Sequence, residues 1–172
     1  MSTTAATLMG EPDYSPGVGQ ALVIGRVQAG QWQKAVTFVD EADATIVPCL
    51  LPKHIASKGT RAPVFGLSVV GDSMDQVFPP GSVLICLPLY EMAGKIKDGD
   101  YVVVHRIKPD GLYEATCKQY RLVEGEMWLA PRSSNPTHIP IRGDTAADDG
   151  SQIEVTAIVF GHYAPMAAAD RI

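Results

Sequence analysis

Residues 63–87 read PVFGLSVVGDSMDQVFPPGSVLICL, and this stretch decides the fold class. It contains two apolar runs, residues 63–70 and 82–87, each of which is typical of a buried strand. Between them, Phe78-Pro79-Pro80-Gly81 is a turn signal, because proline and glycine both interrupt regular structure. The stretch therefore predicts two strands joined by a short connection that is rich in turns.

The same pattern of short apolar runs and turn signals continues along the chain. Turn signals at residues 98–100 and 109–111 make residues 101–120 a β-hairpin. A short helical turn is expected over residues 53–58, and no helical pattern is long enough for a βαβ crossover. The other predicted strands are residues 21–27, 35–39, 125–130, 138–141 and 153–163. We therefore expect a mainly β, curved and largely antiparallel domain with short helical turns.

Length and composition fit one ordinary domain. Of the 172 residues, residues 1–20 are rich in Ser, Thr, Ala, Gly and Pro and predict a flexible linker or arm. Residues 21–165 are the predicted domain, and residues 166–172 are a C-terminal tail. The net charge is -5, from 14 basic and 19 acidic residues, and the basic residues are scattered, which argues against phosphate binding by this segment.

The positions of the charged residues, apolar runs and cysteines argue against secreted, membrane-spanning and zinc-binding proteins. The first basic residue is Arg26, and no apolar run approaches about 18 residues, so neither a signal peptide nor a membrane span is expected. The cytoplasm is then the simplest location. Cys49, Cys86 and Cys117 are odd in number and widely spaced, which fits neither a disulfide framework nor a zinc site.

Ser73 is the candidate nucleophile. It follows Gly71 and Asp72 at the end of a predicted strand, and a helical turn after it would expose the hydroxyl and aim backbone N–H groups at a substrate carbonyl. The same position also suits a helix-capping residue. The tetrapeptide alone leaves both interpretations open.

Lys118 is the candidate general base. In the predicted strand of residues 112–120, period two places Thr116, Lys118 and Tyr120 on one face and Ala115 and Cys117 on the other. If the Lys118 face points inward, desolvation disfavours the charged amine and lowers its pKa, so that a neutral amine can accept a proton. If it points outward, Lys118 is an ordinary solvated lysine.

Other kinds of site have less support. Four histidines, His54, His105, His138 and His162, could serve a Ser-His-Asp triad, but no G-x-S-x-G sequence surrounds Ser73. The histidines lack the spacing of metal ligands, and no glycine-rich phosphate loop is present, so no metal or cofactor is expected.

A candidate scissile bond lies at Ala29-Gly30, in a turn between apolar strands. Two small residues can enter a narrow cleft from which bulkier side chains are excluded. A second such dipeptide, Ala93-Gly94, is assigned to an ordinary loop.

Four motifs, in this order, resemble those of the LexA-like self-cleaving repressors, and the nearest resemblance is to prophage repressors. They are Gly25-Arg26-Val27-Gln28-Ala29-Gly30, Val70-Gly71-Asp72-Ser73-Met74, residues 98–104 (DGDYVVV) and Glu114-Ala115-Thr116-Cys117-Lys118. The similarity extends through residues 127–131 to residues 158–161, and so covers most of residues 21–163.

The resemblance implies a curved β domain of the LexA and signal-peptidase type that acts as a serine peptidase on itself. In it Ser73 is the nucleophile, Lys118 the general base, and Ala29-Gly30 the bond that is cut, within a cleavage loop of residues 25–35. Backbone N–H groups of Ser73 and Asp72 form the oxyanion hole. The resemblance implies no cofactor.

The family also implies partners and a biological setting. Its members form homodimers through this domain, and a RecA filament on single-stranded DNA promotes cleavage in the SOS response. The apolar run of residues 153–163 is the expected dimer edge. DNA binding belongs to a helix-turn-helix domain that residues 1–20 cannot form.

Three alternatives stay open at the level of sequence. A UmuD-like accessory subunit of a translesion polymerase shares the protease fold without a DNA-binding domain. A signal peptidase also uses a Ser-Lys pair but needs a membrane anchor. A non-catalytic binding module would never be cleaved.

Overall fold

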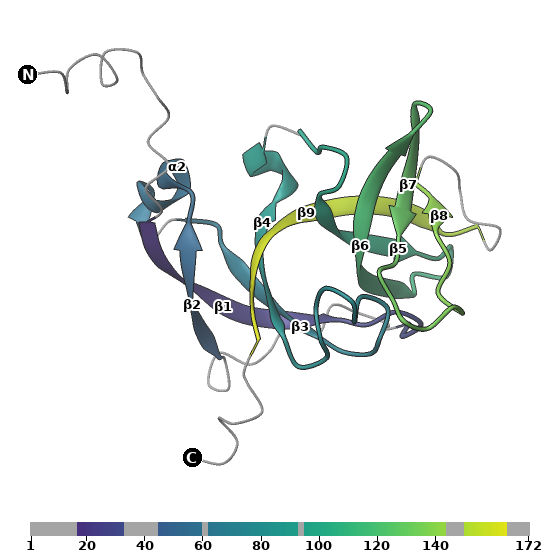
Figure 1. Cartoon of the computed structure of the whole chain (residues 1–172), viewed down its shortest axis with the longest axis horizontal. Coiled ribbons are helices and arrows are strands. Elements are labelled where there is room, and N and C mark those ends of the chain that lie inside the picture. Colours follow the sequence, from purple (N-terminus) through teal and green to yellow (C-terminus); the bar gives the residue numbers. More distant parts are fainter. Residues whose placement is uncertain (1–16, 33–44, 60–61, 93–94, 144–149, 165–172) are drawn as a thin grey trace, which may run out of the picture.

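The computed structural model describes residues 17–32, 45–59, 62–92, 95–143 and 150–164. Within these residues the strands form one nine-stranded sheet in the order β2-β1-β3-β4-β9-β5-β6-β7-β8 (Figure 1). The strands are β1 (Gly17–Val27), β2 (Ile46–Leu51), β3 (Phe65–Val69), β4 (Val83–Pro88), β5 (Tyr101–Ile107), β6 (Tyr113–Val123), β7 (Glu126–Ala130), β8 (Ile141–Arg142) and β9 (Gln152–Tyr163). Two short helices, α2 (Lys53–Ala56) and the 3-10 turn η3 (Leu89–Met92), accompany them.

The predicted fold class is confirmed. The chain is mainly β, and seven of the strand pairings are antiparallel, including the predicted β5–β6 hairpin. The exception is the pairing of β1 with β3, which is parallel. The short helix α2 lies inside the predicted helical turn of residues 53–58.

The ends of several elements differ from the prediction. β1 begins at Gly17, inside the predicted arm, because residues 17–22 pair with β2. β2 itself was not predicted, since Pro48 interrupts its apolar run; β2 is the outermost strand, where the missing N–H of proline is tolerated. The predicted strand 138–141 is displaced to β8, and the predicted strand 35–39 lies outside the described residues.

The C-terminal strand β9 holds the two halves of the sheet together. It pairs with β4 over its second half and with β5 over its first, and Figure 1 shows it curving across both. Within the described residues, β9 is paired on both sides only over residues 157–159, and residues 160–163 have a strand partner on the β4 side alone. The expectation that residues 153–163 form a dimer edge therefore stays a prediction. The apolar run reflects burial in the middle of the sheet.

The strands in the middle of the sheet are covered on both faces. In β5, Val102, Val103 and Val104 are at most 1% exposed. Val103 belongs to a core cluster that also contains Leu84 and Met74, whereas Val102 and Val104 pack with Leu129 on the other face. Residues on both faces of the neighbouring strand β6 are therefore also buried.

Candidate active site

The segment that carries Ser73 is a tight turn between β3 and β4. Gly71 has φ +83°, a left-handed conformation that favours glycine, and it lets the chain leave β3 abruptly. Met74 and Phe78 are 2% and 3% exposed and pack into the core, and this packing attaches the turn to the body of the domain. The Ser73 side chain is itself buried, at 8% exposure.

A second segment, residues 131–138, holds the Ser73 turn in place; we call it the anchoring loop. It follows directly after β7, the strand that pairs with β6. The backbone N–H of Arg132 donates to the carbonyl of Ser73 at 3.2 Å, and the Ser133 hydroxyl donates to the carbonyl of Asp72 at 2.6 Å. The turn that carries Ser73 is thus attached to the chain that leaves the C-terminal end of β7.

The Asp72 side chain strengthens this attachment. Its carboxylate accepts a hydrogen bond from Asn135 Nδ2 at 2.9 Å and contacts His138 Nε2 at 2.7 Å. These hydrogen bonds, first from Asn135 and then from His138, lower the pKa of Asp72. The residue before the candidate nucleophile is therefore held as a carboxylate by two side chains of the anchoring loop.

Within the described residues, the backbone N–H of Ser73 donates no hydrogen bond, and that of Asp72 interacts only with its own carboxylate. Such N–H groups at a rigid turn are the donors that an oxyanion hole requires. The resemblance in sequence implies this role for these two N–H groups.

Lys118 lies on β6 with its side chain buried, at 7% exposure. Its cross-strand partner is Val102, so it shares the sheet face of that valine, while Cys117 is on the opposite face with Val103. Burial is the main reason why the pKa of Lys118 is lowered. Its amine donates to the carbonyl of Cys117 at 3.3 Å. Of the two orientations that the sequence left open for Lys118, the structure has the one in which the side chain points inward.

The bond between Ala29 and Gly30 lies in residues 27–32, at the end of β1; we call these residues the cleavage segment. The segment is hydrogen-bonded on one side to the residue that follows β3 and on the other side to β6. The carbonyl of Val27 accepts the N–H of Val70 at 3.0 Å, just before the Ser73 turn. On the other side, the N–H of Gln28 donates to the carbonyl of Ala115 on β6 at 2.9 Å. The segment thus runs from the start of the Ser73 turn to the strand of Lys118.

Glu114 contacts the candidate scissile bond itself. The backbone N–H of Gly30 donates to Glu114 Oε1, and Glu114 is only 3% exposed. Gly30 has φ +78°, a left-handed conformation that favours glycine. Sequence reasoning included Glu114 in a motif but assigned it no role; its even spacing from Lys118 on one strand was the available signal.

The order of motifs along the chain agrees with a family match. Residues 21–160 match the model of the Peptidase S24-like family. The chain belongs to the Peptidase S24-like family. It is also 31% identical over 156 residues to the LexA repressors of Mycolicibacterium smegmatis, Mycobacterium bovis and Mycobacterium tuberculosis. These alignments cover 84% of this chain and 49%, 51% and 51% of the three relatives, so the chain spans about half the length of the relatives that it matches.

This membership confirms the expected LexA-like self-cleaving family and supports a serine peptidase as the kind of activity. The histidines take other places in the S24-like domain. His138 contacts Asp72, His162 stacks edge-on against Phe78 at 5.2 Å, and none of the described hydrogen bonds joins a histidine to Ser73. A Ser-His-Asp arrangement is therefore not formed by the described residues.

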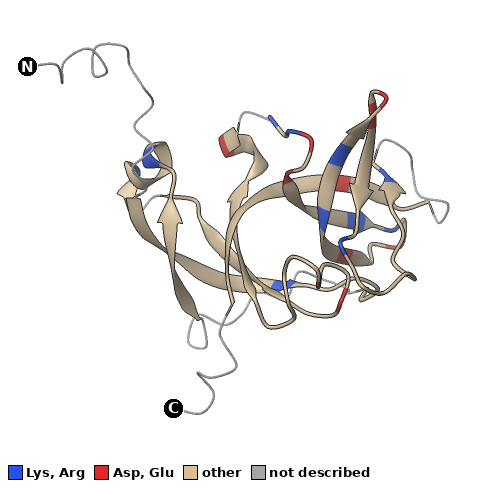
Figure 2. Cartoon of the chain, in the orientation of Figure 1, with Lys and Arg blue, Asp and Glu red and all other residues tan. Residues whose placement is uncertain are grey.

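Among the described residues, no group of three or more His, Cys, Asp or Glu side chains is placed to hold a metal ion. None of the helices in those ranges is long and apolar enough to cross a bilayer. Figure 2 shows that basic and acidic residues are interspersed over the described strands and loops.

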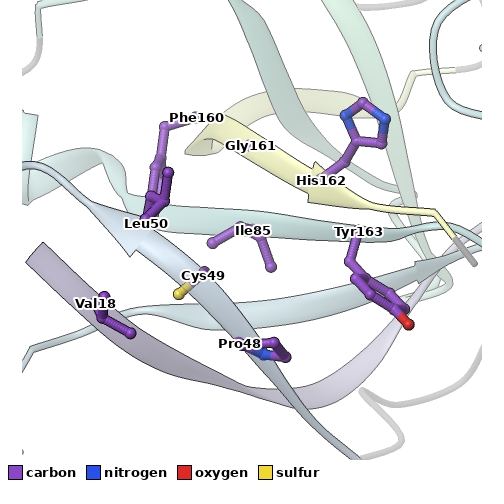
Figure 3. Close-up of a pocket in the computed structure, with 9 residues that line it drawn as sticks. All are labelled: Val18, Pro48, Cys49, Leu50, Ile85, Phe160, Gly161, His162 and Tyr163. Atoms are coloured by element: carbon purple, nitrogen blue, oxygen red, sulfur yellow. The ribbon is translucent and has the colours of Figure 1, made fainter. Parts of the chain in front are cut away.

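A cavity of about 430 Å³ lies elsewhere in the S24-like domain (Figure 3). Residues of β2 and of the end of β9 line it, together with single residues of β1 and β4. They are Val18, Pro48, Cys49, Leu50, Ile85, Phe160, Gly161, His162 and Tyr163. Neither Ser73 nor Lys118 is among them, so the cavity is separate from the candidate active site.

Proposed function

We propose that this chain is the self-cleaving regulatory domain of a LexA-like, prophage-type transcriptional repressor, and that it cuts its own Ala29-Gly30 bond. One observation carries the proposal: the cleavage segment is hydrogen-bonded to β6, the strand on which Lys118 is buried. The segment that would be cut and the base that would drive the cut thus belong to one hydrogen-bonded unit.

The proposed reaction begins with the neutral amine of Lys118. It takes the proton of the Ser73 hydroxyl, and the Ser73 oxygen attacks the carbonyl carbon of Ala29. The backbone N–H groups of Asp72 and Ser73 stabilise the negative charge on the carbonyl oxygen. The C–N bond then breaks, the Gly30 nitrogen takes the proton back from Lys118, and Ala29 remains as an ester on Ser73.

Water completes the reaction. Lys118, neutral again, takes a proton from the water, and the resulting hydroxide attacks the carbonyl carbon of the ester. The bond from that carbon to the Ser73 oxygen then breaks, Ser73 takes the proton back from Lys118, and Ala29 leaves as a carboxylic acid that ionises in water. The Gly30 amine becomes a new N-terminus. The chain is consumed once, so the reaction is a switch and not a turnover cycle.

The proposal includes the family's regulatory setting. The domain is a homodimer, a RecA filament on single-stranded DNA promotes cleavage during SOS induction, and DNA is bound by a helix-turn-helix domain in a longer parent protein. A cytoplasmic location fits each of these roles. The activator needs only to raise the population in which the cleavage segment is docked.

The alternative is a UmuD-like polymerase accessory subunit with the same protease fold. The relatives matched here are named as LexA repressors, which favours the repressor. An upstream helix-turn-helix in the parent reading frame would decide for the repressor, and its absence there for the accessory subunit.

The chemistry is tested by incubating the purified chain at raised pH and measuring its products by mass spectrometry. We expect two fragments that end at Ala29 and begin at Gly30, and no cleavage in Ser73→Ala or Lys118→Ala. Ser68→Ala, on the neighbouring strand β3, is the matched serine control and should cleave like the unaltered chain. Cleavage of Ser73→Ala at an unchanged rate would end the proposal.

A further inference from the structure

Trp32 is the one aromatic side chain of the described cleavage segment, and it lies against two cations. Lys108 Nζ is 4.1 Å from the centroid of the indole ring, and Arg106 Cζ is 5.2 Å from it. Both distances lie within the range in which a cation is attracted to an aromatic face. Trp32 follows Gly30 by two residues, so it is on the C-terminal side of the candidate scissile bond.

The position of Arg106 is set by the protein around it. Its Nη1 is 3.4 Å from Glu114 Oε2, and its Nη2 is 3.4 Å from the Ser151 hydroxyl. Because these partners come from β6 and from the residue just before β9, Arg106 is held from two sides. It presents its planar group to Trp32 as a fixed surface.

The same carboxylate links the indole to the scissile bond. Glu114 interacts with Arg106 through Oε2 and accepts the Gly30 N–H through Oε1. A continuous series of contacts therefore runs from Trp32 through Arg106 and Glu114 to the nitrogen that cleavage would release. Movement of the indole away from its two cations would remove one end of this series.

We propose that Trp32 is the docking anchor of the cleavage segment and that Arg106 and Lys108 form its binding site. The inference rests on the proposed function, since it concerns how the segment reaches Ser73. Trp32 is a positioning residue: it acts by setting the fraction of chains in which Ala29-Gly30 is docked. The site formed by Arg106 and Lys108 therefore favours an aromatic residue at position 32 of the segment that is cut.

The test is the first-order rate of self-cleavage of the full chain with substitutions at Trp32. Loss of both cation contacts in Trp32→Ala should slow cleavage by up to about 5–30-fold. Trp32→Phe keeps an aromatic face and should recover part of the rate. Tyr90→Ala is the control, because that aromatic side chain is in η3 and 73% exposed; it should cleave at the unaltered rate.

A double-substitution series separates docking from general destabilisation. Lys108→Gln should slow cleavage in the unaltered chain but have no further effect in Trp32→Ala, because its partner is then absent. Equal effects of Lys108→Gln in both backgrounds would overturn the proposal. So would a rate for Trp32→Ala equal to that of the unaltered chain.

Reaction of Ser73 with a fluorophosphonate distinguishes failure of the anchor from failure of the proposed function. If the function is correct, Ser73 is labelled in the unaltered chain, and in Trp32→Ala it is labelled at least as fast, since an undocked segment leaves Ser73 more accessible. If Ser73 is not labelled and the unaltered chain never cleaves, the proposed function fails. If labelling is intact and Trp32→Ala cleaves normally, the anchor alone fails.

Discussion

Lys118 is the residue in which structure and proposed chemistry depend most directly on each other. A lysine at 7% exposure beside the buried cross-strand partner Val102 loses most of its hydration, which disfavours the ammonium form. Glu114 and Cys117 act in the opposite direction, but burial dominates, and the pKa stays below the ordinary lysine value of 10.5. The fold thereby produces a larger neutral fraction of amine at any given pH.

The rate of self-cleavage should therefore rise with pH and level off once Lys118 is neutral. The lowered pKa places the plateau below the ordinary lysine value of 10.5. The measurement is the cleavage rate of the full chain from about pH 6 to about pH 10, read by mass spectrometry. Lys118→Arg should stay uncut throughout, because a guanidinium remains protonated over this range. A rate that does not vary with pH would contradict Lys118 as the base.

Among the elements, the anchoring loop has the clearest functional consequence. Residues 131–138 contain no regular secondary structure, yet they bind the turn of Ser73 through its backbone and through the Asp72 carboxylate. Since the loop directly follows β7, it transmits the position of the β6–β7 hairpin to the nucleophile. A rigid turn keeps the two N–H donors aimed at one point.

Loss of the His138 contact should loosen this turn. We expect His138→Ala to slow self-cleavage about threefold to tenfold, because misplaced reacting groups lose rate steeply. The pKa of Asp72 should rise toward its ordinary value, since one of the two hydrogen bonds that lower it is gone. Carbon NMR of the Asp72 carboxyl measures the pKa directly. Ile139→Ala is the neighbouring control: that side chain is 68% exposed and both readouts should be unaltered.

At the scale of the whole molecule, the proposed cut lies immediately after a strand that belongs to the core. Ala21, Val23 and Val27 of β1 are at most 6% exposed, and β1 connects β2 to β3 in the sheet. Before cleavage these side chains are tethered to the rest of the domain through Gly30. Afterwards β1 is held only by its non-covalent contacts.

The cleaved protein should consequently be less stable than the intact chain. If β1 departed, the apolar partners of its three buried side chains would be exposed to water, and the free energy of unfolding would fall. We expect the melting temperature to be lower by about 5–15 °C as a result. Differential scanning calorimetry of the cleaved chain, compared with uncut Ser73→Ala, measures the difference. Identical melting temperatures would show that β1 contributes little to the stability of the domain.

The fold class was accessible from local patterns because most strands are short apolar runs bounded by Gly, Pro or Asp. The hairpin of β5 and β6 is the clearest case, with turn signals on both sides. β2 was not predicted because Pro48 interrupts the apolar run of this outer strand. Residues 17–20 were not predicted as a strand because their β conformation depends on pairing with β2. The place of β9 in the middle of the sheet also depends on partners distant in sequence.

The sequence by itself determined a mainly β chain and the order of its motifs, with Ser73 at a strand end, Lys118 on a strand and Ala29-Gly30 in a turn. Those features are local, since they depend on residue type and on the period of one strand. Only the tertiary structure decided that both faces of β6 are buried, that Asp72 is held by Asn135 and His138, and that the scissile bond contacts Glu114. Burial and contact across the sheet depend on how distant strands pair, which short-range patterns do not specify.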